Sequence, residues 1–454
     1  MTIQSIDPKT GTVIKTYVEL DDQAVQDLLA RAHGAYGLHR RTSYKERAKK
    51  MIGVADYLDS HKDDLARIAT QEMGKTLASS IAEVEKCADL CRFYADKAEG
   101  FLKDQPIDIG ASQSYVRYLP IGIVLAVMPW NFPYWQAFRF AVPALMAGNV
   151  GVLKHASNVP GCAMAIEHAF KKGGFDNHEF QSALIGSSKV EAVIKDDRVR
   201  AVTLTGSEGA GRAVAAQAGK ALKKTVLELG GSDPFIIMPS ADIERTLDLA
   251  VNGRVQNNGQ TCIAAKRFII HEDVYDLYKA KLIERFNALK VGDPLQDDTD
   301  VGPLSMKAIR DELHEQVQQS IKQGAIRLCG AEPMEQEGWF YRPGLLENID
   351  PDNIAYSEEL FGPVGLLFKV SSIDEAIAVA NDTRFGLGSV ICSQDEGEIE
   401  LAINHIDAGL TTVNGNVASH PALPFGGVKS SGYGRELSSD GIREFVNIKT
   451  IVVR

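Results

Sequence analysis

The spacing of hydrophobic and polar residues divides the chain into a helical N-terminal part and two parts in which strands alternate with helices. Residues 1–20 are polar and rich in turn formers, which predicts a short hairpin. Apolar residues then recur at helical spacing up to about residue 102, and we expect these amphipathic helices to pack on a sheet. Ser43 followed by Glu46 predicts a capping box at the start of one helix. The apolar stripe of that helix consists of Ala48, Ile52, Ala55 and Leu58.

Residues 103–120 do not continue the helical spacing of apolar residues. Polar and apolar side chains alternate there next to Pro106 and Gly110, which predicts an extended arm. An arm of this kind buries little surface by itself, so we expect it to pair with another subunit. The chain ends in a further strand-like run at residues 450–453.

Apolar runs and helical segments alternate between residues 122 and 229, which predicts a parallel, doubly wound sheet. Ligands bind at the carboxyl ends of the strands in such sheets. The polar residues expected at those ends are Asn131, Lys154, Ser207 and Glu228. The expected strands are 123–128, 150–153, 199–204 and 225–229, and the expected helices are 135–146, 162–171 and 209–222.

A second α/β unit is expected from residue 233 to about residue 416. The sequence shows no low-complexity linker between the two units, so we expect them to pack tightly with a cleft between them. The expected strands of the second unit are 233–237, 266–271, 365–370, 389–393 and 410–414, and the expected helices are 242–252, 274–289 and 306–324.

Candidate chemistry centres on Cys262, which lies in the polar loop NNGQTC directly before a predicted strand. A thiol in a loop can reach a substrate, whereas a thiol on an apolar stripe packs in the core. Glu228 ends the apolar run TVLE before two glycines follow at 230–231. A nucleophilic sulfur and a partly buried carboxylate are what a two-step acyl-enzyme reaction requires. A cysteine peptidase is disfavoured, since no histidine motif accompanies Cys262.

Composition narrows the possible functions. The 454 residues suggest about two to four domains, and contents of 44% hydrophobic and 24% charged residues are ordinary for a globular protein. The net charge of −11 argues against nucleic acid as a partner. The six cysteines form neither a CxxC pair nor a cluster with histidines, so neither a metal site nor a disulfide framework is expected. Without a signal peptide or a membrane-length apolar run, we expect a cytoplasmic protein with no membrane partner.

Six motifs follow one another along the chain: PWNFP, LTGSEGAG, LELGG, GQTCIA, EELFGPV and PFGGVKSSGYGRE. In this order they resemble the aldehyde dehydrogenase superfamily, and the resemblance by motif covers residues 122–436. Within that superfamily the chain is most similar to the bacterial succinate-semialdehyde dehydrogenases of the short type. The resemblance implies an α/β fold with a Rossmann-type cofactor domain, an α/β catalytic domain and a small β oligomerisation element.

The resemblance also implies the catalytic residues. Cys262 matches the family nucleophile, Glu228 the general base that activates water for hydrolysis of a thioester, and Asn131 the amide that stabilises the oxyanion. A free thiol is only a few per cent ionised at pH 7, so it needs activation. Burial is expected to raise the pKa of Glu228 towards the working pH, which suits a base.

A nicotinamide cofactor is implied in the same way. The Gly-rich turn 206–211 is not a GxGxxG motif, but in the family this turn faces the cofactor pyrophosphate. A carboxylate that accepts hydrogen bonds from both hydroxyls of a ribose is expected at Glu359. The cofactor-binding residues that the resemblance implies are Trp130, Gly206, Ser207, Gly211, Glu359 and Phe361.

The choice between NADP and NAD depends on a departure from the family pattern. Members that prefer NAD often carry a glutamate three residues after the lysine that corresponds to Lys154, and this chain has Ser157 there. A small hydroxyl leaves room for a 2′-phosphate, removes the repulsion of a carboxylate, and leaves Lys154 as a cation. We therefore predict NADP as the preferred cofactor, with NAD as a weaker one.

A semialdehyde that carries a carboxylate needs a cation at the far end of its site. Arg139 matches the arginine that semialdehyde dehydrogenases use for this purpose, and Trp135 lies one helical turn earlier. Ser419 is a plausible second donor. The alternative is that Arg139 only extends its charge towards solvent or pairs with an acidic residue at the surface.

These predictions combine into one hypothesis, the oxidation of an aldehyde to a carboxylic acid through a cysteine thioester, with succinate semialdehyde as the expected substrate. Two alternatives stay open: a dehydrogenase of broad aliphatic or other semialdehyde specificity, and a non-catalytic protein of the same fold, like the related lens crystallins. The chain is expected to form a homodimer or homotetramer. The expected domains are a cofactor domain (1–102 and 121–229), a catalytic domain (230–428) and an oligomerisation arm and tail (103–120 and 429–454).

Overall fold

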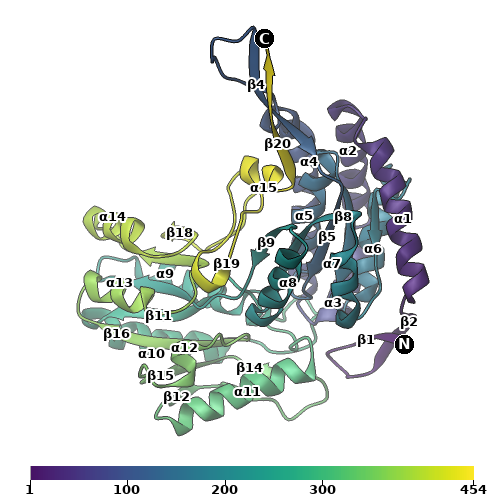
Figure 1. Cartoon of the computed structure of the whole chain (residues 1–454). Coiled ribbons are helices and arrows are strands. Elements are labelled where there is room, and N and C mark those ends of the chain that lie inside the picture. Colours follow the sequence, from purple (N-terminus) through teal and green to yellow (C-terminus); the bar gives the residue numbers. More distant parts are fainter. Residues whose placement is uncertain (1) are drawn as a thin grey trace.

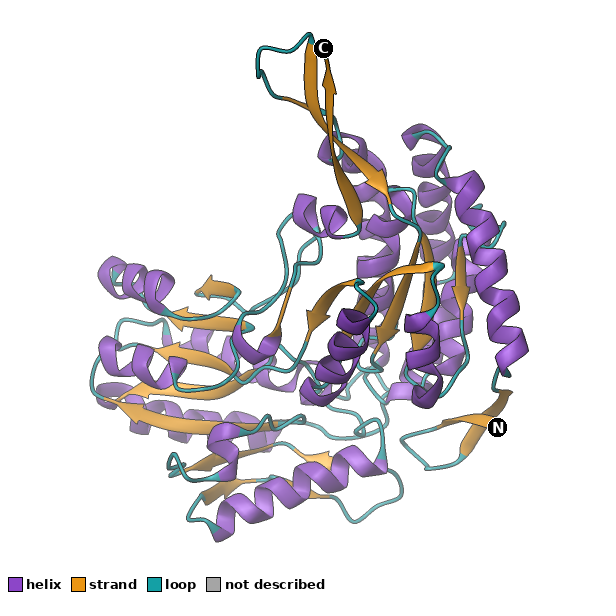
Figure 2. Ribbon diagram, in the orientation of Figure 1, coloured by secondary structure: helices purple, strands orange, loops and turns teal. Residues whose placement is uncertain are grey.

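The computed structural model describes residues 2–454. Figure 1 shows two α/β lobes with a β-ribbon that projects from one of them and carries the C-terminus. Each lobe is built on its own sheet, with helices on both sides of it, as Figure 2 shows by colour. The predicted α/β fold is therefore confirmed. Within the part of the chain that the structure describes, every helix is too short or too polar to cross a membrane.

The N-terminal part begins with the predicted hairpin, in which β1 (Thr2–Ile6) and β2 (Val13–Val18) pair antiparallel. The predicted capping box is present, because Ser43 and Glu46 each accept a hydrogen bond from the other's backbone. The predicted apolar stripe was partly wrong, since Ile52 is exposed while Met51 and Val54 are buried. The helices are α1 (Asp22–His39), α2 (Tyr44–Ser60), α3 (Lys62–Met73) and α4 (Leu77–Phe101).

The first sheet is parallel except for one short edge strand. Its central strand, β5, is apolar throughout because both of its faces are buried: Val124 and Ala126 contact one core cluster, and Ile123 and Leu125 contact the other. In spatial order the strands are β19 (Gly432–Tyr433), β9 (Lys224–Glu228), β8 (Val199–Thr205), β5 (Ile123–Met128), β6 (Val150–His155) and β7 (Phe180–Ser182). The predicted strands and helices of this unit are present, and β7 and α7 were missed.

Helices cover both faces of the first sheet. One face is covered by α1, α7 and α8, and the other by α5 and α6. Of the N-terminal helices only α1 contacts the sheet as predicted, whereas α2, α3 and α4 pack chiefly on one another and on α5 and α6 as an outer layer. The remaining helices of this lobe are α5 (Trp135–Met146), α6 (Pro160–Lys172), α7 (Val190–Lys195), α8 (Glu208–Lys220) and the 3₁₀ turn η1 (Ser187–Lys189).

The second lobe has a seven-stranded sheet that is parallel apart from its edge strand β12. Its strands in spatial order are β12 (Ile326–Cys329), β15 (Gly344–Glu347), β16 (Val364–Val370), β11 (Ala265–His271), β10 (Asp233–Ile237), β17 (Gly388–Cys392) and β18 (Leu410–Val413). A short pair, β13 (Glu332–Pro333) and β14 (Tyr341–Arg342), lies apart from it. The helices are α9 (Ile243–Val255), α10 (Glu272–Ala288), α11 (Lys307–Lys322), α12 (Ile354–Ser357), α13 (Ile373–Asn381) and α14 (Glu396–His405).

The projecting ribbon joins the predicted arm to the predicted tail. β4 (Gln113–Pro120) pairs antiparallel with β20 (Val446–Val453) along its whole length, and β3 (Gln105–Pro106) extends this sheet. The arm therefore finds a strand partner within its own chain. Ile448, Val452 and Val453 remain exposed on the ribbon, and the role of the ribbon in oligomerisation stays a prediction. α15 (Ser438–Glu444) leads from the first sheet into β20.

Candidate active site

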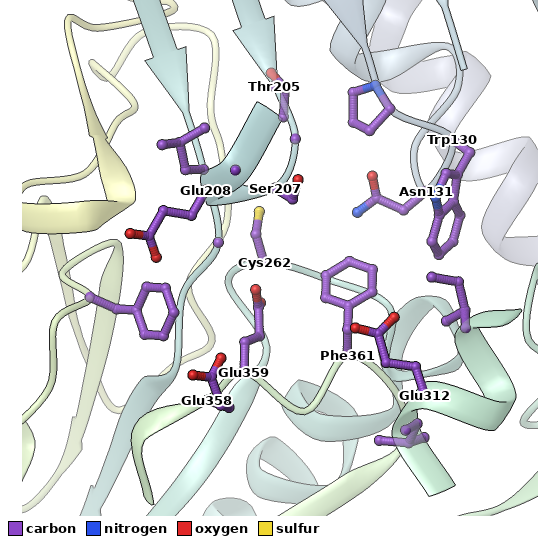
Figure 3. Close-up of a pocket in the computed structure, with 18 of the residues that line it drawn as sticks. Trp130, Asn131, Thr205, Ser207, Glu208, Cys262, Glu312, Glu358, Glu359 and Phe361 are labelled. Atoms are coloured by element: carbon purple, nitrogen blue, oxygen red, sulfur yellow. The ribbon is translucent and has the colours of Figure 1, made fainter. Parts of the chain in front are cut away.

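A cavity of about 540 Å³ lies between the two lobes, at the carboxyl ends of β8 and β9. Its size is within the usual range for small-molecule sites. Figure 3 shows Cys262 in the middle of this space, with Asn131 and Trp130 from the first lobe and Glu359 and Phe361 from the second around it. The predicted cleft is confirmed, and its walls come from distant parts of the sequence.

The loop that carries Cys262 has an unusual backbone. It begins as the short 3₁₀ turn η2 (Gln256–Gly259), in which Asn257 and Asn258 both have φ near +58°. Asparagine tolerates this left-handed region better than most residues, although each such residue still costs on the order of 1 kcal/mol. Gly259 follows with φ +73° and has no room for a side chain beside Gly362 and Pro363.

Hydrogen bonds from buried side chains hold this loop in place. The Asn258 amide donates to the carbonyls of Gly74 and Pro303, both at 2.9 Å, and accepts from the Gly302 N–H. The Gln260 side chain accepts from the Ser305 N–H at 3.0 Å. The loop is therefore tied to both lobes, which fixes the position of the thiol.

Replacing Asn258 with alanine is expected to destabilise the protein by about 3 kcal/mol and to lower kcat, because three buried backbone groups lose their partner. Urea unfolding and steady-state kinetics would measure both effects. Asn404→Ala is the matched control, since Asn404 is exposed and bonds only to Glu400 on its own helix among residues 2–454. Equal stabilities of the two variants would contradict this account of the loop.

Asn131 lies against the Cys262 loop. Its Nδ2 donates to the Gln260 carbonyl at 2.9 Å, and its own carbonyl accepts from the Asn257 amide at 2.8 Å. These reciprocal bonds fix the side chain and use one of the two Nδ2 protons. Figure 3 shows the Asn131 amide and the Cys262 thiol pointing into the same space. The second proton is left without an acceptor among residues 2–454, and the predicted role of Asn131 towards an oxyanion stays a prediction.

The electrostatics of Cys262 favour the neutral thiol at rest. Burial raises the pKa of the thiol to about 12, while the cations Lys266 and Arg139 act to lower it. Lys266 is itself engaged, since its Nζ donates to the Cys262 carbonyl at 2.7 Å and lies 2.9 Å from the Glu359 carboxylate. The Cys262 thiol therefore needs a base or a bound ligand to become a thiolate.

Glu228 ends β9 and is completely buried. Its carboxylate faces Arg139 and Glu436 behind the cavity wall, and both of its oxygens lack a hydrogen bond from residues 2–454. Burial raises the pKa of Glu228 well above its usual value, and the neighbouring charge of Glu436 raises it further. Gly426 makes room for this side chain, because a Cβ there would lie 2.6 Å from the Glu228 Oε1.

Most of the predicted cofactor residues line the cavity. Trp130 and Phe361 form an edge-to-face pair with their rings 5.7 Å apart. Ser207 caps the N-terminus of α8, with its Oγ accepting from the Ala210 N–H. The predicted cofactor residues at the cavity are Trp130, Gly206, Ser207, Glu359 and Phe361. Gly211 lies elsewhere, where its missing side chain lets α8 pack closely on Leu229.

Lys154 and Ser157 lie just outside this cavity, at the carboxyl end of β6. Lys154 is buried, and burial lowers its pKa, while Ser157 is exposed. Both residues lie at the same edge of the sheet as Ser207, because β6 and β8 are parallel to β5.

The three predicted substrate residues, Trp135, Arg139 and Ser419, are not among the residues that line the cavity; Trp135 and Arg139 lie one turn apart on α5. The Nε1 of Trp135 donates to Ser419 Oγ at 2.9 Å. Arg139 is buried, stacks over Phe425 with 4.5 Å to the ring centroid, and lies 2.7 Å from Glu436. Its charge thus has a partner within the protein, although this partner is buried and is not the surface acid of the alternative interpretation, and the role of Arg139 towards substrate stays a prediction.

Sequence reasoning missed the partners of these residues. Glu436 was noticed only as the end of the motif SGYGRE, and its position beside Arg139 and Glu228 depends on the long return of the chain to the first sheet. Lys86 on α4 was missed altogether, although its Nζ donates to Ser419 at 2.9 Å. Neither contact leaves a signal in local sequence.

Comparisons with known proteins agree with this geometry. The aldehyde dehydrogenase family matches residues 1–451. A protein of Mycobacterium tuberculosis named succinate-semialdehyde dehydrogenase [NADP(+)] 1 is 53% identical over 99% of both chains. Among solved structures, the succinic semialdehyde dehydrogenase of Streptococcus pyogenes in complex with NADP⁺ has a TM-score of 0.97, with 40% identity over 99% of both chains. The protein Gox0499 has a TM-score of 0.98, with 39% identity over the whole of both chains.

Proposed function

Because the chain belongs to the aldehyde dehydrogenase family, we propose that it oxidises succinate semialdehyde to succinate with NADP as the oxidant. The observation that carries this proposal is the identity of 53% over almost the whole chain to a relative with that name. The geometry agrees, since Cys262 and the Asn131 amide meet in a cavity between the lobes. The solved relative from Streptococcus pyogenes, with its NADP⁺, supports the choice of cofactor.

In the proposed reaction the Cys262 sulfur bonds to the aldehyde carbon, and the carbonyl oxygen becomes an oxyanion. The free Nδ2 proton of Asn131 stabilises this oxygen, an interaction that is typically worth about 3 kcal/mol in enzymes. Because the thiol is neutral at rest, its proton must first leave, and Glu228 is the candidate acceptor. Loss of a hydride from the same carbon converts the adduct into a thioester on Cys262.

The cavity fits a nicotinamide cofactor. Ser207 and Gly206 present the N-terminus of α8, which favours a pyrophosphate, and Glu359 presents a carboxylate that is held by the ion pair with Lys266. Trp130, Gly206, Ser207, Glu359 and Phe361 would hold it. When bound, the nicotinamide supplies the acceptor for the hydride.

The thioester is then hydrolysed by water. Glu228 is the proposed base, because burial raises the pKa of its carboxyl well above the usual value and makes the carboxylate a stronger proton acceptor. It lies behind the cavity wall, so its side chain must turn towards Cys262 for this step. Attack by the activated water breaks the carbon–sulfur bond and releases the acid and the free thiol.

Ser157→Glu is expected to shift the ratio of kcat/KM for NADP over NAD by on the order of 10²-fold towards NAD. The new carboxylate would repel the 2′-phosphate and could accept hydrogen bonds from the ribose of NAD. Steady-state kinetics with both cofactors measures this ratio. Ser157→Ala removes the hydroxyl without adding a charge and is the control, and an unchanged ratio in Ser157→Glu would rule out a role for this position.

The proposal as a whole is tested with a panel of aldehydes against NADP and NAD. We expect the highest kcat/KM for succinate semialdehyde with NADP. Similar values for unsubstituted aliphatic aldehydes would favour the broad-specificity alternative. No oxidation of any aldehyde by the folded protein would contradict the proposal.

A further inference from the structure

A buried lysine lies directly behind the loop that carries Cys262. Lys266 is the second residue of β11, and only 1% of it is exposed. Its Nζ donates to the carbonyls of Thr261 at 2.9 Å and of Cys262 at 2.7 Å. The same nitrogen lies 2.9 Å from Oε1 of Glu359, which lines the cavity. One ammonium group thus joins the backbone of Cys262 to a carboxylate of the cavity wall.

Packing alone does not explain this lysine. A charge that is removed from water costs free energy, and an apolar side chain of similar length would fill the same space without that cost. Among residues 2–454, Lys266 is not one of those that line the cavity. Its polar contacts are made instead to the Cys262 loop and to Glu359, and both of these reach the cavity. Lys266 therefore acts on the cavity through these two partners.

The contact with Thr261 fixes the direction of the next backbone N–H. In a trans peptide, the carbonyl oxygen and the N–H of the following residue point in opposite directions. The peptide bonds of residues 2–454 are all trans, and the Thr261 carbonyl points towards Lys266. The N–H of Cys262 therefore points away from Lys266, and it donates to no other backbone group of residues 2–454. Lys266 thus orients a backbone donor of Cys262 itself.

Lys266 also affects the charge of the Cys262 sulfur. Burial raises the pKa of the thiol most, and four charged side chains act on it as well. The cations Lys266 and Arg139 lower this pKa, and the carboxylates Glu359 and Asp233 raise it. Of the four, Lys266 has the largest effect. Without Lys266, the two carboxylates would be opposed by Arg139 alone.

The other end of the contact fixes Glu359. Figure 3 shows the Glu359 carboxylate beside the Cys262 thiol. Lys266 forms the only ion pair of this carboxylate within residues 2–454. On its other side the carboxylate lies against the backbone at Gly230, where any side chain would collide with Oε2. The orientation of Glu359 therefore depends on Lys266 and on the lack of a side chain at Gly230.

We propose that Lys266 is a positioning residue that couples the cofactor-binding carboxylate of Glu359 to the nucleophile Cys262. One buried cation orients the Cys262 backbone, favours the thiolate of its side chain and holds Glu359 in place. This role rests on the proposed function, which gives Cys262 and Glu359 their parts in the reaction. A single substitution outside the cavity should therefore weaken both the reactivity of the thiol and the binding of NADP.

The first measurement is the rate at which iodoacetamide alkylates Cys262 in the protein without cofactor. Only the thiolate reacts, so the rate follows the ionised fraction of the thiol. In Lys266→Met we expect the rate at pH 8 to fall by at least about tenfold, because the cation with the largest effect on the thiol is lost. Peptide mass spectrometry identifies the alkylated cysteine. Lys369→Met, an exposed position on the neighbouring strand β16, is the matched control and should keep the rate.

The second measurement is the Kd of NADP, followed by quenching of tryptophan fluorescence. We expect Kd to rise by on the order of tenfold in Lys266→Met, because Glu359 loses the cation that holds it. Glu359→Gln should raise Kd as well. In the double variant the two effects should not add, because Lys266 acts on NADP only through Glu359.

An unchanged alkylation rate in folded Lys266→Met overturns the proposed coupling, as do additive effects of the two substitutions on Kd. If Lys266→Met does not fold, Glu359→Gln carries the alkylation test. Release of Lys266 from its ion pair should then raise the rate by at least about threefold, and an unchanged rate overturns the proposal. A wild-type protein that binds no NADP refutes the proposed function, whereas the alkylation rates still decide the role of Lys266 towards Cys262.

Discussion

Cys262→Ala is expected to lower kcat/KM for aldehyde oxidation by at least about 10⁴-fold, since a covalent route through the thiol has no substitute once the sulfur is gone. Cys262 lies in the middle of the cavity between the lobes, next to the amide of Asn131 (Figure 3). The change removes one half-buried sulfur atom, so we expect the fold and its thermal stability to be kept. Steady-state kinetics with a saturating cofactor measures the effect.

Cys329→Ala is the matched control for this substitution. Cys329 is also half-buried, but it lies on β12 at the far edge of the second sheet. Its loss is expected to leave the rate within about twofold of wild type, because surface and edge positions seldom affect chemistry. Aldehyde oxidation by folded Cys262→Ala at the wild-type rate would remove the thioester from the proposed reaction.

Strands and helices of the central sheets could be predicted because local pattern and tertiary environment agree there. β5 is apolar at every position, and the structure buries both of its faces between helices. The loop with Cys262 could be predicted as a loop because Asn257, Asn258 and Gly259 favour left-handed backbone. By contrast, β7 has only three residues, and it is a strand because it pairs with β6. The local sequence pattern does not show this pairing, so β7 could not be predicted.

The candidate site could be predicted only in part, because some of its contacts join residues that are far apart in the sequence. Cys262 and Asn131 belong to short motifs, so their types and spacing are visible in sequence. The ion pair of Arg139 with Glu436 and the contact of Lys86 with Ser419 join residues about 300 positions apart. The charge state that each residue needs is therefore set by partners that only the fold brings together.

Glu228→Gln is expected to lower the steady-state kcat by about 10²- to 10⁴-fold, because hydrolysis of the thioester loses its base. If Glu228 acts only on water, the first turnover is kept, and a rapid-mixing experiment shows a burst of about one reduced cofactor per active site before the slow phase. Glu191→Gln, an exposed change on α7, is the control. A variant that loses the burst as well would place Glu228 at removal of the thiol proton.

The pH dependence of kcat provides a second test of the role of Glu228. Burial and the adjacent Glu436 raise the pKa of Glu228, whereas Arg139 and Arg435 oppose this shift. The base is protonated and inactive below its pKa and ionised above it, so the wild-type kcat should rise with pH, at pH values above those at which an ordinary carboxyl group titrates. In Glu228→Gln this rise should disappear, since glutamine does not titrate. Parallel pH profiles of the two proteins would show that another group limits hydrolysis, and Glu228 would then serve only to position Arg139.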